Sequence, residues 1–569
     1  MKKINNKLLL LGLLFTIGFY SCEDKFLDEE QNYIIDSESY FNSEDDYYLA
    51  LIGVYDLLAS TWVNNLVGGI ASDDSFSGGE SPVDVPGMQQ IDDMIHTPVN
   101  NDLKVIWDGM FAGIKRANYF LEFQNNIEFD DREIMVAEVR FLRAYYHFEL
   151  VKWFGGIPIK EYQNALLGQG KRFAPGDETI VPRYSFSDVY ALIESDLIYA
   201  VNTLNYTAPN IGRATKGAAQ ALLGKAYLFQ DKFSEASNIL VNLIDNGPYQ
   251  LVQNQFEGGE LSSIGYAKIF ENGGENGPES VFEVQYTDGE GAGFGCLQCS
   301  EGNVAVGFMG IRNPSYFLDH PNFDEFTEPL PQNIIDQLDE ILVNIGANPV
   351  GSGPLFDGGY SFNVPTQEAF DIYAEEDLRR DVSILDIQAL SETIDPIPFV
   401  DDSNGTITGT PLDSYSIDYS WVNGHKHTGY YNKKYLARRG DQNIGDSNLT
   451  NPNNYRSIRY ADVLLMAAEA LNKQGIDPAA QSYLNLVRER AFGTTDYNIT
   501  ATGTELGDAI FEERRLELMG EGHRFFDLVR TGKAPQVIDG FVADKHEVFP
   551  IPFQEIQFSN GNWSQNPNY

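Results

Sequence analysis

The feature that most constrains how this chain can fold is a pair of expected helices within residues 215–249. The segment reads TKGAAQALLGKAYLFQDKFSEASNILVNLIDNGPY. Gly224 and Ala236 are small where two antiparallel helices would touch, and Tyr227 is large enough to fill the gap beside them. Pro248 cannot continue a helix and so ends the second one. The segment therefore predicts two closely packed antiparallel helices.

These spacings match the tetratricopeptide template, in which helix pairs stack on one another to bury a shared apolar face. A looser second copy lies within residues 459–491, RYADVLLMAAEALNKQGIDPAAQSYLNLVRERA, with Gly475 and Pro478 in its turn. One copy could arise in any helix pair, whereas two copies far apart in one chain favour a repeated scaffold. We therefore expect a mainly α fold with tetratricopeptide-like pairs.

The composition changes along the chain. From about residue 44 to 246, acidic residues repeatedly precede apolar residues at helical spacing. Between about 249 and 455, Gly, Asn, Asp, Pro and aromatic residues dominate, with short strand-like pieces such as ESVFEVQYT. Long loops on a rigid scaffold commonly carry binding surfaces. The expected regions are a signal peptide at 1–21, an N-terminal helical region at 22–248, a loop-rich, partly β ligand-binding insertion at 249–455, and a C-terminal helical region with an extended tail at 456–569; residues 22–569 are expected to form one integrated fold.

The N-terminus has the layout of a secretory signal. Three lysines precede the apolar stretch Leu8 to Phe19, which is too short to span a bilayer. Cys22 follows at once, and a cysteine at a cleavage point is typical of bacterial lipoproteins, in which the thiol carries a lipid anchor of two acyl chains. The alternative is that this apolar stretch is the first buried helix of the fold, but the sequence becomes polar abruptly at CEDKFLDEE, which disfavours it. We predict that Cys22 is lipidated.

The charge balance limits the class of partner. The chain has 83 acidic and 39 basic residues, a net charge of −44. Such a surface repels phosphate backbones, so nucleic acid is a poor candidate partner.

Motifs for catalysis or metal binding are few. The chain has no HExxH, G-x-S-x-G, G-x-G-x-x-G or P-loop motif. His425 and His427 could share a metal with a carboxylate, but a solvated or sugar-facing loop is the favoured interpretation. Cys296 and Cys299 lack the second cysteine pair of a zinc site, so they form either a small disulfide, which we favour, or two thiols lining a pocket. We expect no metal and no cofactor.

Asp73 and Asp74 lie in a Gly/Ser loop together with Phe76. Two acids could serve a glycoside hydrolase, but adjacent acids point in different directions and no facing acid is evident. The alternatives are a turn with helix-capping or solvated acids, and ligand recognition. In ligand recognition, carboxylates accept hydrogen bonds from sugar hydroxyls while an aromatic ring covers the apolar face of the sugar.

A second charged stretch, IFEERRLELMGEGHRFFDLVRTGKA, looks at first like an active site. Its charged residues instead fall at i, i+3 and i+4 spacings, which suit ion pairs along and between helices. We predict a structural role for Glu512, Glu513, Arg514, Arg515, Glu517, Glu521 and Arg524.

Taken in order, these pieces resemble the SusD/RagB-like outer-membrane lipoproteins. The resemblance runs nearly end to end, through SCEDKFLDEE, EVRFLRAYYHFELVKWFGGIP, ATKGAAQALLGKAYL, YRSIRYADVLLMAAEAL, ERRLELMGEGHRFFDLVRTG and FPIPFQEI. The chain closes on QNPNY, with Asn568 where the family commonly has Gly, a departure that affects only the tail.

The resemblance implies a right-handed superhelix of tetratricopeptide helix pairs that carries a loop-rich, ligand-binding half. Members sit on the outer face of the outer membrane, anchored by lipid, and cap a SusC-like TonB-dependent β-barrel as a hinged lid. They bind an oligosaccharide between lid and barrel, and they are not enzymes. For this chain a neutral glucan or fructan is favoured, since a charged polysaccharide would need a basic patch.

Ligand contacts vary among such proteins, so they are predicted from loop composition. The candidates are Asp73, Asp74 and Phe76 from the first loop, and Cys296 or Cys299, Arg312, Tyr316, Trp421, Arg379 and Tyr415 from the central insertion. Arg312 could equally form a structural ion pair, and Trp421 could belong to the core.

Three other functions remain open on sequence grounds. A peptide-capturing protein of the same import system would use the same scaffold. A surface glycosidase would need two facing carboxyl groups. A lipoprotein that only holds other proteins would leave the aromatic insertion unexplained.

Overall fold

The computed structural model describes residues 40–159, 179–289, 296–297, 300–312, 315–319, 358–390, 392–394, 400–401, 406–407, 415–420, 424–437 and 449–569. For the strands at 315–319, 392–394, 400–401, 406–407 and 415–420 the description is of the backbone. The expected signal peptide, the lipidation site Cys22, and the candidate residues Cys299 and Trp421 lie outside these ranges.

The N-terminal part of the chain is helical, and successive helices pack against each other. Ser43 and Ser185 begin two of the helices with complete capping boxes, in which each serine pairs with an aspartate three residues on. Gly155, at φ 68°, ends the helix Arg132–Phe154. The helices are α3 (Glu44–Asp56), α4 (Trp62–Ile70), α5 (Pro86–Asp92), α6 (Asn101–Glu122), α7 (Arg132–Phe154), α8 (Phe186–Thr203), α9 (Lys216–Leu228) and α10 (Phe233–Asn246).

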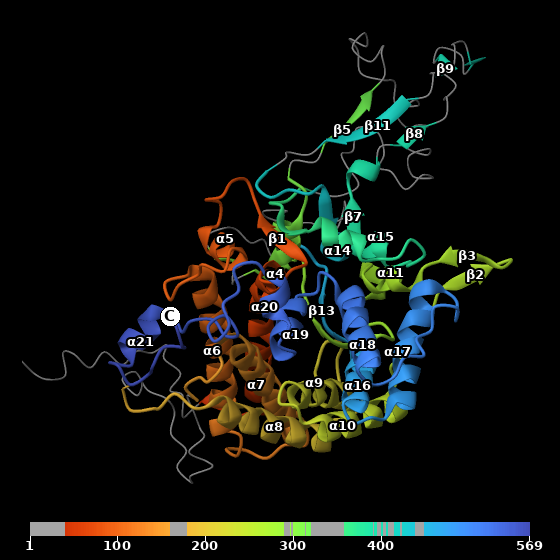
Figure 1. Cartoon of the computed structure of the whole chain (residues 1–569). Coiled ribbons are helices and arrows are strands. Elements are labelled where there is room, and N and C mark those ends of the chain that lie inside the picture. The colour runs from red at the N-terminus through yellow and green to blue at the C-terminus, as the bar shows by residue number, and fades with distance from the viewer. Residues whose placement is uncertain are drawn as a thin grey trace, which may run out of the picture.

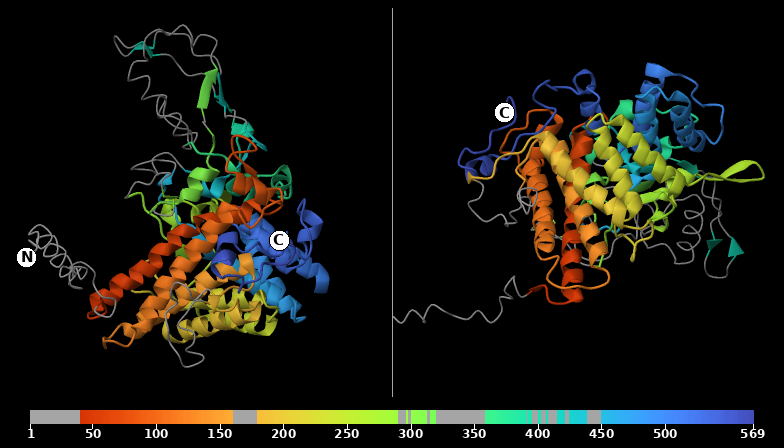
Figure 2. Two further views of the ribbon diagram at one scale, coloured as in Figure 1. Left: turned by 90° about the vertical axis from the view of Figure 1, so that its left-hand side faces the viewer. Right: turned by 90° about the horizontal axis from the view of Figure 1, so that it is seen from below.

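The expected helix pairs are present, so the prediction of a mainly α, tetratricopeptide-like scaffold is confirmed. α9 packs on α10, and a side chain at Gly224 would overlap Leu240 of α10. α10 in turn packs on α16, which joins the two copies into one array (Figures 1 and 2). The second copy comprises α16 (Tyr460–Asn472) and α17 (Asp477–Phe492), followed by α18 (Gly503–Leu518), α19 (Arg524–Arg530), α20 (Ala534–Val537) and α21 (Phe553–Phe558).

Short helices and two- or three-stranded sheets make up the rest of the described chain. β1 (Ser75–Gly78) pairs with β6 (Phe362–Pro365), β4 (Ser280–Val284) with β13 (Tyr455–Arg459), and β7 (Ile384–Asp386) with β12 (Tyr430–Asn432), all antiparallel. The sheet of β5 (Ser315–Asp319), β11 (Tyr415–Ser420) and β8 (Glu392–Ile394) projects from the helical body in Figure 1. The remaining described strands and α-helices are β2 (Gln255–Glu257), β3 (Glu260–Ser263), β9 (Val400–Asp401), β10 (Thr406–Ile407), α11 (Gly265–Ile269), α12 (Val304–Met309), α14 (Gln367–Asp371) and α15 (Arg380–Ser383).

Among the described helices none is both long and apolar enough to cross a membrane.

A buried network of ion pairs centres on α18 and the turn that follows it. Glu517 accepts hydrogen bonds from Arg490 at 2.6 Å, Arg459 at 2.8 Å and Arg379 at 3.1 Å. Burial alone would raise the pKa of Glu517, but these three guanidinium groups lower it well below its usual value. Glu521 pairs with Arg459 and Lys434 in the same way.

The network extends along the C-terminal half of α18. Glu513 pairs with Arg379 and Arg488, each through one carboxylate oxygen. Arg514 pairs with Asp462 of α16 and Asp527 of α19. The predicted structural role is therefore confirmed for the buried residues of this charged stretch and is wrong for Glu512, which is exposed. α18 is the element that ties the C-terminal helices to β13 and to the central region.

We expect Glu517→Gln to lower the free energy of unfolding by about 3–5 kcal/mol, because it leaves buried guanidinium charge uncompensated. Urea unfolding of the purified protein measures the loss. Glu512→Gln is the matched control: Glu512 lies on the exposed face of the same helix, and its replacement should change stability by less than about 0.5 kcal/mol. Equal stability of the two variants would contradict the structural role of the network.

We also expect a pH effect from buried histidines. Four of the six histidines that the structure describes are buried, among them His147 of α7. Burial, with a smaller contribution from Arg143, lowers the pKa of His147 to about 4. The unfolded chain therefore binds a proton at a higher pH than the folded chain. The contribution of His147 to the free energy of unfolding is therefore fully present above about pH 6.5, and it is lost as the pH falls toward 4.

Through His147 the free energy of unfolding should fall by about 2 kcal/mol between pH 7 and pH 5. The melting temperature of the natural chain should fall over this range, and that of His147→Asn should fall less steeply. Parallel curves for the two proteins would contradict the prediction.

Candidate functional site

The candidate site is built around β1 and the glycine turn that follows it. Phe76 is half-buried in β1, whereas its neighbours Ser75 and Ser77 are buried. Phe76 lies opposite Val364 of β6 in the antiparallel pair. The strand ends at Gly78, whose φ of 72° and close approach to Ser361 leave no room for a side chain. β1 is thus a short, tightly held strand that presents one aromatic ring.

Three segments that are far apart in the sequence meet at this turn. The Gly79 N–H donates to the Ser361 carbonyl at 2.8 Å, and the Gly79 carbonyl accepts from the His425 N–H at 3.0 Å. The Ser361 hydroxyl accepts from the Arg312 N–H at 2.9 Å. Residues 75–84, 310–312 with 358–362, and 424–429 therefore form one surface, which we call the β1 face. It lies in the upper part of the molecule in Figure 1, where β1 and α5 are labelled.

Lys426 crosses the β1 face. Its ammonium group binds Asp92 at 2.8 Å and Asp93 at 2.7 Å, and it lies 5.8 Å from the centre of the Phe76 ring. Partial burial lowers the pKa of Lys426, but the two carboxylates more than offset this and raise it above its usual value. Lys426 is therefore a fixed, charged neighbour of the Phe76 ring.

Arg312 occupies the other side of the same turn. It forms ion pairs with Asp84 at 3.2 Å and Glu80 at 3.5 Å, and it donates to the Tyr360 carbonyl at 3.0 Å. The side chain remains 15% exposed. Arg312 thus forms the ion pair that the sequence allowed, at a place where it also borders the surface. Its role as a ligand contact stays a prediction.

Aromatic and imidazole rings share this surface. Tyr360, His425 and His427 are half-buried, as Phe76 is. His427 accepts a hydrogen bond from the Gly424 N–H at 3.0 Å through Nδ1. Within the described part of the chain, no group of three or more His, Cys, Asp or Glu residues could hold a metal ion. Together these side chains offer rings, hydroxyl groups and fixed charges to a polar ligand.

Asp73 and Asp74 do not belong to the exposed part of this site, contrary to the sequence prediction. Asp73 accepts two hydrogen bonds from Arg524, at 2.8 and 2.9 Å, and Asp74 accepts one from Arg515 at 2.7 Å. Their side chains are only 6% and 4% exposed. Burial raises the pKa of Asp74 to about 6, although Arg515 opposes the rise. The two acids anchor the start of β1 to α18 and α19.

The ligand role predicted for Arg379 is likewise wrong. Arg379 is fully buried, and it donates to Asp377, Glu513 and Glu517 within the α18 network. No part of its guanidinium group reaches the surface. Its charge serves the scaffold.

Of the other predicted residues, some lie outside the described ranges and the rest are described only in part. Cys296 is disulfide-bonded, while Cys299 and Trp421 lie outside the described residues. Tyr316 of β5 pairs with Tyr419 of β11, and Tyr415 of β11 pairs with Ile394 of β8, so both candidate tyrosines belong to one sheet. Their roles remain predictions.

Sequence reasoning missed Lys426 and Tyr360. Lys426 stands between His425 and His427, which drew attention for metal binding, but its acidic partners Asp92 and Asp93 are more than 300 residues away in the chain. No local spacing signals such a contact. The only available signal was the concentration of polar and aromatic residues in the segment WVNGHKHTGYYNKKY.

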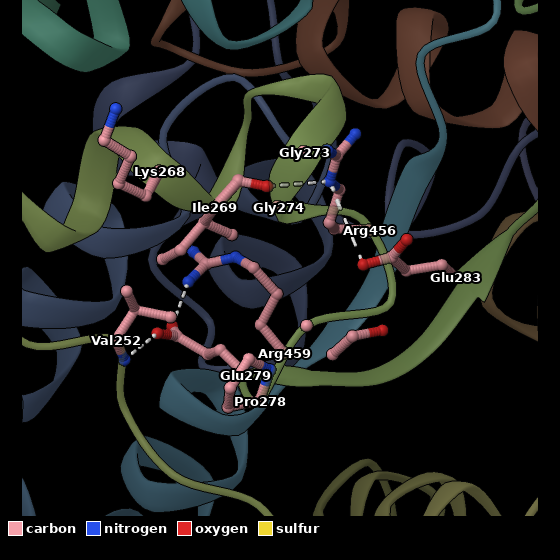
Figure 3. Close-up of a pocket in the computed structure, with 12 residues that line it drawn as sticks. Val252, Lys268, Ile269, Gly273, Gly274, Pro278, Glu279, Glu283, Arg456 and Arg459 are labelled. Atoms are coloured by element: carbon pink, nitrogen blue, oxygen red, sulfur yellow. Dashed lines mark hydrogen bonds and ion pairs between the residues drawn. The ribbon is translucent and has the colours of Figure 1, made fainter.

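A pocket of about 200 Å³ lies beside α11, β4 and β13 (Figure 3). Arg459 donates to Glu279 at 2.9 Å in its wall, and Glu279 also accepts from the Val252 N–H at 3.1 Å. Arg456 donates to the Ile269 carbonyl at 3.2 Å. The lining residues include no aromatic ring on which a sugar could pack, so the pocket is not the candidate ligand site.

Two family models match the chain. Residues 362–543 match the family described as the SusD family. Residues 25–228 match a family described as starch-binding and associating with the outer membrane.

Whole proteins of the same kind align over nearly the full length. SusD-like protein P25 of Formosa agariphila is 24% identical, over 98% of this chain and 97% of its own. A solved laminarin-binding SusD-like protein is 30% identical, with a TM-score of 0.71, over 93% of this chain and 100% of its own. Surface glycan-binding protein A from Bacteroides fluxus is 26% identical, with a TM-score of 0.70, over the same shares.

Proposed function

The chain belongs to the SusD family, and from this premise we propose that it is a cell-surface lipoprotein that captures a neutral glucan for import. Proteins of this family bind glycans and do not act on them chemically, so the chain is a binding protein and not an enzyme. In the proposed role it acts as the lid of a SusC-like TonB-dependent transporter and is held to the outer membrane by lipid on Cys22.

The observation that carries the proposal is the arrangement of the β1 face. A half-buried Phe76 ring lies beside fixed hydrogen-bonding groups, and this combination suits a sugar, which has apolar faces and a rim of hydroxyl groups. The ring is held in place because Arg515 and Arg524 fix the residues just before it. A ligand would therefore meet a preformed surface.

The charges on the β1 face favour a neutral glycan over an anionic one. Both cations on it are already matched by acids: Lys426 by Asp92 and Asp93, and Arg312 by Asp84 and Glu80. An anionic polysaccharide would have to compete with these carboxylates. Laminarin, a neutral glucan, is our choice of ligand because the solved relative that is 30% identical is named as laminarin-binding.

The test uses the soluble chain from residue 23 onward. We expect laminarin in a native gel to retard its migration, and calorimetry to show binding without release of reducing sugar. Phe76→Ala should weaken binding by about tenfold, which corresponds to the loss of roughly 1.4 kcal/mol of ring contact. An unchanged melting temperature would confirm that the variant is folded.

Phe558→Ala is the control, because Phe558 is an exposed phenylalanine of α21, away from the β1 face. It should bind as the natural chain does. Equal binding by both variants would show that the ligand does not contact Phe76. Binding to peptides and to none of the polysaccharides would replace the proposed function with peptide capture.

A further inference from the structure

We propose that the protein has a second carbohydrate pocket, remote from the β1 face, between residues 206–215 and 276–283. This inference rests on the proposed function, because the ligand it assigns to the pocket is a part of the same neutral glycan. The pocket has a volume of about 490 Å³. That volume lies within the range of about 300–1,000 Å³ that is usual for small-molecule sites.

The pocket is separate from the β1 face. One wall is the loop that joins α8 to α9, and the other is the turn and strand at 276–283. In Figure 1, α8 and α9 lie in the lower part of the molecule, whereas β1 and α5 lie in its upper part. The pocket and the β1 face therefore lie on different parts of the molecule, so a polymer has two places to bind.

The charges in the pocket point to a neutral ligand. Its lining includes two charged residues, and both are already paired. Arg213 donates to both carboxylate oxygens of Glu138, at 2.6 and 2.7 Å. Glu283 accepts from the Asn276 N–H at 3.0 Å and from the side-chain amide of Asn454 at 3.2 Å. Arg456 also lies 3.9 Å from Glu283, so each charged residue of the lining already has an opposite charge beside it.

Aromatic rings and polar groups in the pocket suit a sugar. The Tyr206 hydroxyl donates to Gln220 at 2.9 Å, and the Tyr249 hydroxyl lies 3.0 Å from the Thr215 hydroxyl. Each phenol is thereby fixed, and each ring is half-buried in the wall. Sugar rings present C–H faces that pack on such aromatic surfaces.

The rim adds polar and apolar contacts. Thr207 and Asn210 are exposed there, and Ile211 is 80% exposed, which is unusual for an isoleucine that borders a pocket. An apolar residue beside exposed amide and hydroxyl groups again matches the mixed surface of a sugar.

The hollow drawn in Figure 3 borders the same turn, and it shares Gly277, Pro278, Ser280 and Glu283 with this pocket. The two hollows differ in chemistry, since the smaller one is walled by Arg456 and Arg459. The carbohydrate pocket is the larger, tyrosine-lined one.

Hydroxyl-radical footprinting of the soluble chain with a laminarin hexasaccharide tests the proposal. We expect protection at Tyr206 and Tyr249 as well as at Phe76, and calorimetry should give two sugars bound per chain. Ile211→Ser and Tyr206→Ala should each remove protection in the pocket and reduce the stoichiometry to one. Ile211 is exposed, so its replacement carries little risk to folding.

Val99→Ala is the matched control, because Val99 is 73% exposed and does not line the pocket. It should leave both sites intact. Protection at Phe76 with none at Tyr206 and Tyr249 would overturn the second pocket and leave the proposed function standing. An absence of binding to laminarin and to every other neutral glycan would overturn both.

Discussion

The buried pairing of carboxylates with guanidinium groups on α18 is the interaction on which the rest of this structure depends. Taking such charges out of water is expensive, and it is tolerated only where partners and hydrogen bonds are nearly complete. Glu517 meets this condition with Arg379, Arg459 and Arg490. These partners come from three different parts of the chain, so the pairing fixes how those parts fit together.

The same helix also positions the candidate site. Arg515 of α18 and Arg524 of α19 bind Asp74 and Asp73, which directly precede β1. Phe76 is therefore anchored to the C-terminal scaffold, more than 400 residues away in the sequence. We infer that the network serves the placement of β1 as much as it serves stability.

Local patterns predicted the scaffold well and the site poorly. The helix pair at 215–249 was predictable because the spacing of Gly224 and Ala236 encodes contact between neighbouring helices. The structural role of the α18 charges was predictable because charges at i, i+3 and i+4 lie on shared faces of a helix. Their partners were not predictable, since Arg490, Arg379 and Asp74 lie 27, 138 and 441 residues from the α18 residues that they bind.

The wrong predictions of site residues arose from contacts between residues that are far apart in the sequence. Asp73, Asp74 and Arg379 look like ligand residues because they are charged and lie in polar segments, yet each is buried by partners that are distant in sequence. Lys426 went unnoticed for the same reason, since Asp92 and Asp93 are far from it along the chain. Phe76 and Arg312 both lie on the β1 face, and their roles as ligand contacts remain predictions.

Two sites on separate faces would change how the protein handles a polymer. Each contact alone can be weak, which allows release toward a transporter, while two contacts on one chain raise the effective affinity for a long glycan. A short oligosaccharide would gain nothing from the second site. Selection by length would then follow from the distance between the sites and not from any single strong contact.

The most direct test of the central claim is a crystal structure of the soluble chain with a laminarin hexasaccharide. We expect a sugar ring against Phe76, with hydroxyl groups bonded to Arg312, Lys426 or their carboxylate partners. A structure with the sugar bound elsewhere and the β1 face bare would contradict it.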